Sequence, residues 1–324
     1  MILVAIDHAD GAPRRASLEL VAAARALAAP GETLTGVVVG GREATLAADA
    51  IAGYLPRVLL VQGDELERPS HERRTSALAA AARETGAEVV LLAANRGGQA
   101  VGPRLAMRLA GALLEDLTAV RREEGALDGE RLAYLSRASL TVRAEARPVV
   151  VSMKPGAFEA AEPAATTGEV VRVEVAPECG DEVARLGARH AAQRGRVALE
   201  EAEVVVCGGR GLGDAESFER HVVGLAVDLG AGVASTRAVV DAGWRAFEEQ
   251  VGQTGKSVSP KLYVALGVSG AVQHLSGMNR SGTVVAVNKD GDAPVFRVAD
   301  YAVVGDVHEV VPALRAALAA ARQR

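Results

Sequence analysis

The chain has 324 residues, 49% of them hydrophobic and 24% charged, a balance typical of globular proteins with one or two domains. Only 3% are aromatic and the formal net charge is −5, which argues against a protein that stacks single-stranded bases or binds a phosphate backbone broadly. We therefore expect no nucleic-acid partner.

The cysteines, the histidines and the hydropathy pattern exclude several further classes. Cys179 and Cys207 form no CxxC motif, and the six histidines are scattered, so a metal site has little support. Unpaired thiols suit a reducing compartment. The sequence shows no signal peptide and no apolar run long enough for a membrane span. We expect a cytoplasmic protein without stable membrane insertion.

The first part of the chain alternates predicted strands and helices. Buried strands are indicated by continuous apolar runs, and helices by apolar residues spaced three or four apart. In chain order these are the strand ILVAID (2–7), a helix over 17–29, the strands LTGVVVGG (34–41) and YLPRVLLVQG (54–63), a helix over 75–85, the strand AEVVLLAA (87–94) and a helix over 103–114.

The middle of the chain is less regular. Three strand-like pieces, DLTAVRRE (116–123), ERLAYLSRAS (130–139) and RPVVVSMKPGAF (147–158), are interpreted as antiparallel additions or an edge. A Pro- and Ala-rich stretch follows, then EVVRVEVAP (169–177) and a polar helical piece, which together read as a connecting arm over 155–200. The predicted domains are residues 1–195, an α/β domain of the nucleotide-hydrolase kind with this arm, and residues 196–324.

The second domain repeats the α/β pattern. Five short apolar runs each end in small or polar residues: EVVVCGG (203–209), GVASTR (232–237), LYVALGV (262–268), TVVAVNKD (283–290) and YAVVGD (301–306). They alternate with helices or loops, and a last helix is expected to begin near Pro312 because proline favours the first helical position. This pattern is typical of a doubly wound parallel sheet.

Ligands of such a sheet bind beyond the carboxyl ends of its strands. The segments at those ends carry glycines, hydroxyls, amides and arginines, a composition expected around a nucleotide. They are Gly208–Gly211, Thr236–Arg237, Ser269–Gly270, Asn288–Asp290 and Asp306, joined by the loop QVGQTGKS (250–257). GGRGLG lacks the third glycine of the dinucleotide fingerprint, because Asp214 stands there, and GVSGAV fails too. A standard NAD-binding domain is disfavoured. Each glycine cluster alone favours a tight turn over a phosphate loop, whereas the clusters together, at successive strand ends, favour a ligand site.

The stretch LYVALGVSGAVQHLSGMN (262–279) passes from a strand through small residues into a predicted helix. Gly267 and Gly270 let a ligand approach the backbone. Unpaired amides at the start of the helix favour an anion, and Gln273 and His274 can add donors there. The alternative is that His274 is a histidine satisfied within the core or at the surface.

Several of these segments, in this order, resemble the C-terminal domain of the electron-transfer flavoprotein alpha subunit. They are GGRGLG, STRAVVDAGW, VGQTGK, LYVALGVSGAVQHLSGM and VAVNKDGDAPVFRVADYAVVGD, which cover most of residues 203–312. The N-terminal part resembles the family more weakly, through ILVAID and RPVVVSMKPGAF. The resemblance implies a heterodimer with a beta subunit and one FAD. It implies electron carriage from acyl-CoA or other dehydrogenases toward an acceptor such as a quinone oxidoreductase, and leaves bifurcation open.

The resemblance also implies the residues that contact FAD. Arg210 is expected near the pyrophosphate, Arg237 beside the isoalloxazine, the Thr254 hydroxyl near N5 and His274 near O2. Thr236 replaces a family serine, and Asn288, Asp306 and Val307 are expected around the adenosine half. The full predicted set is Arg210, Thr236, Arg237, Val251, Gly252, Gln253, Thr254, Ser269, Gly270, Ala271, Val272, Gln273, His274, Asn288, Asp306 and Val307.

Elementary electrostatics agrees with this assignment. A reduced flavin carries negative charge over N1 and O2, and His274, Arg237 and the helix amides are expected to supply positive potential. The plainer interpretations are a surface ion pair for Arg237, a turn residue for Thr254 and a loop for Asn288–Asp290. Two other functions stay open from the residues alone. One is a flavin- or nicotinamide-dependent dehydrogenase acting directly on a small substrate, and the other is a non-redox nucleotide-binding module.

Overall fold

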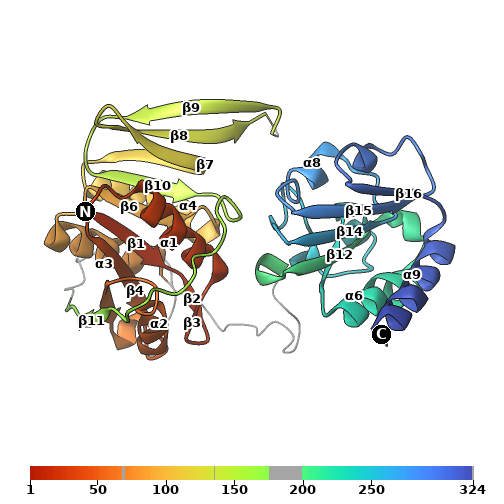
Figure 1. The fold of residues 1–324 in the computed structure, drawn as a ribbon, viewed down its shortest axis with the longest axis horizontal. Helices are drawn as coiled ribbons and strands as arrows, with labels where there is room; N and C mark the ends of the chain where they lie inside the picture. Colours follow the sequence, from red (N-terminus) through yellow and green to blue (C-terminus); the bar gives the residue numbers. More distant parts are fainter. Residues whose placement is uncertain (68–69, 135, 175–198, 323–324) are drawn as a thin grey trace. The chain divides into compact units, whose positions relative to one another are not determined.

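The computed structural model describes residues 1–67, 70–134, 136–174 and 199–322. The chain divides into two compact units, Met1–His190 and Ala191–Arg324 (Figure 1). That division and the predicted boundary after residue 195 both lie outside the described residues.

The N-terminal unit is built on a nine-stranded sheet with the order β11-β5-β4-β1-β6-β10-β7-β8-β9. The strands from β11 to β7 run parallel to one another, and β8 and β9 continue the sheet antiparallel. The strands are β1 (Ile2–Ile6), β4 (Leu34–Gly40), β5 (Arg57–Gln62), β6 (Val89–Ala93), β7 (Ala112–Glu123), β8 (Ala126–Ala133), β9 (Ala138–Ala144), β10 (Val149–Met153) and β11 (Glu169–Arg172), with a small hairpin of β2 (His8–Ala9) and β3 (Ala12–Pro13).

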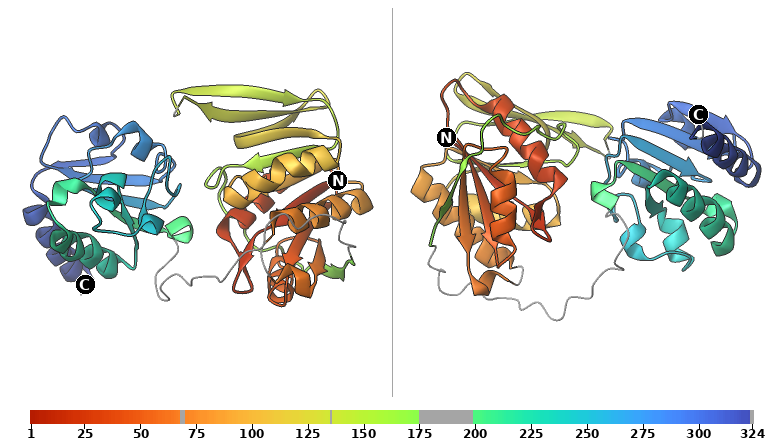
Figure 2. Two further views of the ribbon diagram at one scale, coloured as in Figure 1. Left: turned by 180° about the vertical axis from the view of Figure 1, so that it is seen from behind. Right: turned by 60° about the horizontal axis from the view of Figure 1, so that its bottom comes forward.

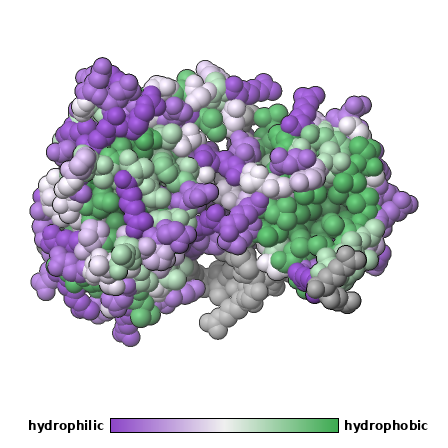
Figure 3. All heavy atoms as spheres, viewed as in Figure 1, coloured by the Kyte–Doolittle hydropathy of each residue, from purple (hydrophilic) through white to green (hydrophobic). Residues whose placement is uncertain are grey.

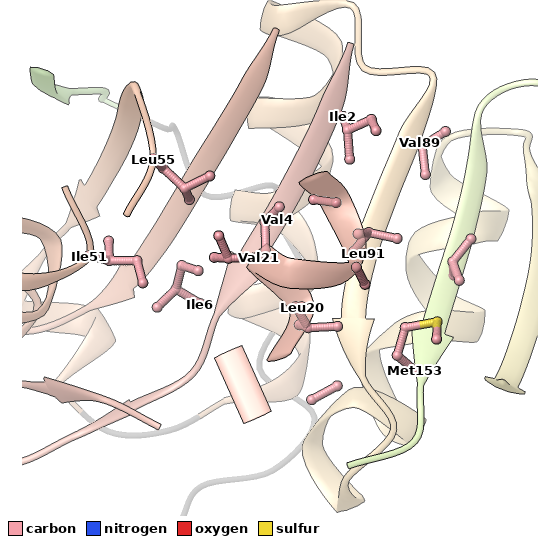
Figure 4. Close-up of a cluster of buried hydrophobic side chains, with 14 of the residues drawn as sticks. Ile2, Val4, Ile6, Leu20, Val21, Ile51, Leu55, Val89, Leu91 and Met153 are labelled. Carbon is pink, nitrogen blue, oxygen red and sulfur yellow. The ribbon is translucent and has the colours of Figure 1, made fainter. Parts of the chain in front are cut away.

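Helices cover both faces of this sheet, as the two ribbon views show (Figure 2). The helices are α1 (Arg15–Leu27), α2 (Ala44–Ile51), α3 (His71–Thr85) and α4 (Arg96–Arg108). Side chains alternate along a strand, so Ile2, Val4 and Ile6 of β1 pack with α1 and α2 on one face (Figure 4), while Leu3 and Ala5 pack with α3 and α4 on the other. This burial on both faces explains why the parallel strands read as continuous apolar runs.

Three expectations for this unit are corrected. Val149–Met153 is not an edge or an antiparallel addition, because β10 lies parallel between β6 and β7 and is buried throughout. The helix expected over 103–114 begins at Arg96 and ends at Arg108, because Asn95 caps it by accepting from the Gly98 amide at 2.9 Å. Part of the expected arm, Glu169–Arg172, pairs with β5 as a sheet edge. Antiparallel pairing is present where β7 meets β8 and β8 meets β9, but the piece predicted over 130–139 is divided between the end of β8 and the start of β9.

The C-terminal unit contains a parallel sheet with the order β13-β12-β14-β15-β16. Its strands are β12 (Val204–Gly208), β13 (Gly232–Ser235), β14 (Leu262–Leu266), β15 (Thr283–Asn288) and β16 (Tyr301–Val304). Strand order reverses between β12 and β14, where neighbouring connections leave in opposite directions. This is the topological switch point at which doubly wound sheets bind ligands.

The two faces of this sheet are covered differently. One is packed by helices, and the other by the segment 250–258 and short turns. The helices of the first face are α5 (Ala215–Phe218), α6 (Gly224–Leu229), α7 (Arg237–Asp241) and α9 (Val307–Ala321), with a π-helical turn over Glu219–Val223, and the short α8 (Val272–Leu275) lies on the second face. The last helix begins at Val307 rather than near Pro312, because Asp306 accepts from the His308 amide at 2.9 Å and caps it.

Candidate functional site

The predicted contact residues follow successive strands of the C-terminal sheet. Because all five strands are parallel, their carboxyl ends share one edge, and the segments that follow them line it. In sheet order these are Thr236–Arg237 after β13, Arg210 after β12, Ser269–His274 after β14, Asn288 at the end of β15 and Asp306 after β16. The structure therefore brings together what the sequence predicted from separate motifs.

At the switch point, the loops after β12 and β14 touch through their backbones. The Gly211 amide donates to the Gly267 carbonyl at 3.1 Å. A Cβ on Gly209 would lie 2.2 Å from the same carbonyl oxygen, and Gly267 has a φ of +62°. Glycine is required at both positions, by steric contact at the first and by backbone conformation at the second. The contact fixes the separation of Arg210 and Ser269 across the switch point.

Asn288 shapes the loop after β14 from the neighbouring strand. Its Nδ2 donates to the Val268 carbonyl at 2.9 Å, and its Oδ1 accepts from the Asp290 amide at 3.0 Å. Both ends of the side-chain amide are thus used within the chain, so Asn288 holds the 267–270 loop in place. Of the other residues expected around adenosine, Val307 is buried in the core and Asp306 caps α9.

The segment 250–256 closes on itself beside β13. The Lys256 amide donates to the Gln250 carbonyl at 2.8 Å, and the Gly252 amide donates to the Lys256 carbonyl at 3.0 Å. The Gln253 amide reaches across to the Gln273 carbonyl at 2.8 Å, which joins this segment to α8. Gln253 and Thr254 are exposed at the tip. The loop is therefore a rigid turn with two polar side chains on its open side.

Sequence reasoning missed Gln250, whose side chain is buried at the base of this turn. Its Nε2 donates to Thr254 Oγ1 at 2.9 Å. Glutamine is seldom fully buried unless its amide is bonded. The signal in the sequence that could have indicated Gln250 is its place as a polar residue directly before the small-residue loop, where the chain returns to the core.

His274 is buried rather than facing solvent. Its Nδ1 lies 3.0 Å from the Val251 carbonyl, which can only accept, so Nδ1 carries the proton. Its Nε2 lies 3.1 Å from the Tyr263 hydroxyl and therefore accepts from it. Burial lowers the pKa of the ring to about 4, against a small opposing effect of the Val251 bond. The imidazole is neutral at pH 7, so it is not the cation that the sequence interpretation required.

The helix predicted after Gly270 is a single short turn. α8 has four residues, Val272–Leu275, and its first residue follows Ala271 with no side-chain cap. A single turn has only a weak macrodipole. Positive potential at this end of the sheet must come from individual amides and from arginines.

Arg237 is the exposed arginine at the start of α7. Its Nε lies 3.4 Å from Asp241 one turn later, and 70% of its side chain is exposed. Exposed pairs of this kind contribute little free energy, so the guanidinium is available to another anion. Thr236 caps α7 through its backbone, and its amide donates to the Gly208 carbonyl at 3.1 Å.

The residues at this edge fit a flavin nucleotide. A Cβ on Gly213, whose φ is +93°, would meet no described atom within 4 Å, so the loop after β12 is open on its outer side. Ser235 Oγ, directly before Thr236, is buried without a hydrogen-bond partner among the residues that the structure describes. Backbone amides, hydroxyls and two exposed arginines are the donor set that phosphates and a ring with added charge require.

Comparison with known proteins decides the family. Residues 2–178 match the family described as "Electron transfer flavoprotein domain", and residues 198–279 match the one described as "Electron transfer flavoprotein FAD-binding domain". The electron transfer flavoprotein subunit alpha of Mycobacterium tuberculosis H37Rv is 43% identical over 321 residues, 98% of each chain. Its counterpart from Mycobacterium leprae is 41% identical over 313 residues, 96% of each chain.

The chain belongs to the electron transfer flavoprotein alpha subunit family. A more distant member, from Megasphaera elsdenii, is 34% identical over 334 residues. Membership confirms the resemblance, the two-domain α/β fold and FAD as the cofactor of the C-terminal domain. A dehydrogenase acting directly on a small substrate is not favoured. Among the described residues, no helix combines the length and the apolar character that crossing a membrane requires.

Proposed function

We propose that this electron transfer flavoprotein alpha subunit holds one FAD at the carboxyl edge of its C-terminal sheet, within a heterodimer with a beta subunit. The complex takes electrons from acyl-CoA or other dehydrogenases and delivers them to an acceptor such as a quinone oxidoreductase, in the cytoplasm. The observation that carries this proposal is the convergence of five polar loops on the switch-point edge, in the domain that matches the FAD-binding family.

FAD, when bound, supplies the electron-transfer chemistry, and the chain supplies binding, orientation and electrostatics. The paired loops at Arg210 and Ser269–Gly270 offer amides and a cation for the pyrophosphate. The turn over Val251–Thr254 and the adjoining α8 segment, including Ala271, Val272 and Gln273, are assigned to the isoalloxazine side. Asp306 and the Val307 backbone are assigned to the adenosine side, with Asn288 holding the loop between them.

His274 contributes as a buried, neutral linker. It ties the Val251 carbonyl to the Tyr263 hydroxyl of β14, and so fastens the 250–256 turn to the sheet. A neutral ring at this position holds one proton at Nδ1 and releases none near pH 7. We assign His274 to positioning the turn and excluding water beneath it.

Arg237 is assigned the role of the cation that favours electron uptake. Replacing Arg237 by alanine removes a positive charge near the ring, so we expect the midpoint potential of FAD to fall by on the order of 50 mV. Arg220→Ala is the matched control, because Arg220 is also exposed and pairs one turn away, with Glu216. Spectroelectrochemical titration of both variants as heterodimers measures the difference. An unchanged or higher potential in Arg237→Ala would contradict the assignment.

The surface of the C-terminal unit supports a partner subunit. All four residues of the edge strand β16 are exposed, including Val303 and Val304. Figure 3 shows apolar side chains spread over a face of this unit. An edge strand with exposed apolar residues on both faces is a site for another chain. We assign this surface to the beta subunit.

Expression without the beta subunit is therefore expected to give a chain that loses its FAD and aggregates, because an apolar interface is left in water. Coexpression is expected to give a yellow heterodimer. Gel filtration with absorbance at protein and flavin wavelengths measures both. A monomer that keeps its flavin through the column would contradict the assignment of this surface to the beta subunit.

The same preparation tests the proposed function. The heterodimer is expected to accept electrons from a reduced dehydrogenase and to show no turnover with a small donor alone. A complex that stays colourless with excess FAD, or that oxidises a small substrate without a partner protein, would overturn the proposal.

A further inference from the structure

The buried glutamine at the base of the 250–256 turn bonds through its side chain to the hydroxyl at the tip of the turn. Gln250 is 3% exposed, and its Nε2 donates to Thr254 Oγ1 at 2.9 Å. Its backbone is held on both sides, since its amide donates to the Phe247 carbonyl at 3.0 Å and its carbonyl accepts from the Lys256 amide at 2.8 Å. These two hydrogen bonds fix the backbone position from which the Gln250 side chain extends.

The turn between the two residues is equally constrained. The Gly255 amide donates to the Gly252 carbonyl at 3.0 Å, and a Cβ on Gly255 would lie 2.3 Å from the Gln250 carbonyl oxygen. The turn is too tight for a side chain at residue 255, so Gln250 and Thr254 are held opposite each other. The remaining freedom is the rotation of the Thr254 hydroxyl about its C–O bond, and the hydrogen bond from the Gln250 amide restricts that rotation.

A hydroxyl has one proton and two acceptor positions. Because Gln250 Nε2 is a donor, it occupies one acceptor position and turns the Thr254 proton away from the core. Thr254 is exposed, so that proton points to the open side of the turn. The arrangement makes Thr254 an outward donor before any ligand arrives, which is the preorganisation that electrostatic stabilisation depends on.

We propose that Gln250 is a positioning residue that fixes the Thr254 hydroxyl as a hydrogen-bond donor toward the bound flavin ring. The inference rests on the proposed function, in which the turn faces the isoalloxazine. A donor held toward the ring favours the charge that electron uptake adds to it. Reversing or releasing the hydroxyl is therefore expected to lower the midpoint potential while FAD stays bound.

Two substitutions at Gln250 distinguish a freely rotating Thr254 hydroxyl from one whose proton is turned inward. Gln250→Met keeps the length but removes the donor, so the hydroxyl rotates freely. Gln250→Glu keeps the shape but accepts from Thr254, which turns the proton inward. We expect the electron affinity of bound FAD to fall about threefold in the first variant and about tenfold, or about 59 mV for a one-electron couple, in the second. We expect the Kd for FAD to change by less than about threefold in both.

The control is a double-mutant cycle with Thr254→Val, which removes the hydroxyl at nearly constant shape. If Gln250 acts through Thr254, Gln250→Met shifts the potential no further in the Thr254→Val background, and Gln250→Glu shifts it less there than in the presence of the hydroxyl. Ser257→Glu, at an exposed position of the same segment, measures the effect of added charge alone. Potentials are read by spectroelectrochemistry and Kd values by flavin fluorescence, both on the heterodimer.

An equal shift from Gln250→Glu with and without the Thr254 hydroxyl would overturn the proposal, because charge alone then explains it. No shift from either Gln250 change, in a wild-type background that binds FAD, would overturn it as well. Absence of FAD from the wild-type heterodimer is a different result, and it would count against the proposed function itself. If Gln250→Met does not fold, the near-isosteric Gln250→Glu cycle still decides.

Discussion

Replacing Gly270 by alanine is expected to remove about 3–5 kcal/mol from the unfolding free energy of the C-terminal unit, and with it the bound FAD. Gly270 has a φ of +81°, and a Cβ there would lie 2.3 Å from the Val295 amide nitrogen and 2.6 Å from the Val295 Cα. Val295 is 1% exposed, and its amide donates to the Ser269 carbonyl at 3.1 Å. The added Cβ would clash with the backbone of Val295, which cannot rotate away as a side chain could, so the loop that contains Gly270 has to move away from Val295.

Gly230→Ala is the matched control. Gly230 also has a positive φ, +63°, but a Cβ there would meet no described atom within 4 Å. That variant is expected to lose only the conformational cost, about 1 kcal/mol. Urea unfolding of the heterodimers, followed by far-UV circular dichroism, measures both, and flavin absorbance before unfolding shows how much FAD each variant keeps. Equal losses in the two variants would mean that the contact with Val295 contributes nothing.

Acid is expected to destabilise the C-terminal unit by about 3 kcal/mol through His274 alone. Burial lowers the pKa of the folded ring from 6.5 to about 4. Above the unfolded pKa both states are neutral and the unit has its full stability. Between pH 6.5 and 4 only the unfolded chain takes up the proton, so stability falls as the pH falls, and below about 4 the loss is complete.

The imidazole of His221 adds to this trend. Its Nε2 lies 3.0 Å from Nδ1 of His308, and burial, followed by the charge of His308 and then of Arg220 and Arg315, lowers its pKa, against a small opposing effect of Asp306. The free energy of unfolding therefore changes with pH in the same direction as for His274, because protonation of His221 is also disfavoured in the folded state. Acid sensitivity should therefore persist in part when His274 is replaced.

His274→Asn is the variant that isolates the larger contribution. It removes the titrating group, so unfolding free energies measured in urea from pH 7.5 to 4 should fall less steeply than in the wild type. A wild-type slope in His274→Asn would show that the ring is already protonated, or not buried, in solution.

The geometry of the proposed site was predictable in part because its turns are set by local sequence. The strands that lead into it are short apolar runs, and the glycines after them mark turns that other residues do not allow. Five parallel strands place their ends on one edge by geometry alone, so Arg210, Ser269 and Asp306 were assigned together before any contact was known. The position of β10 was not predictable, because a buried run of five residues reads alike at an edge or at the centre.

Charge state and orientation depended on neighbours that sequence spacing does not reveal. His274 follows small residues in a promising motif, yet its ring contacts Val251 and Tyr263 and is neutral. Gln250 carries no motif of its own and matters only through its burial against Thr254.

The amino-acid sequence by itself predicted the fold class and the edge of the sheet at which we propose that FAD binds, since apolar periodicity and glycine placement act between near neighbours in the chain. The family was indicated by the resemblance of whole segments to known members. Tertiary structure alone decided strand order, the burial of His274 and the contact between Gln250 and Thr254. Each of these is set by the surroundings that packing creates, where burial and a single carbonyl or amide a few ångströms away outweigh the intrinsic preference of the side chain.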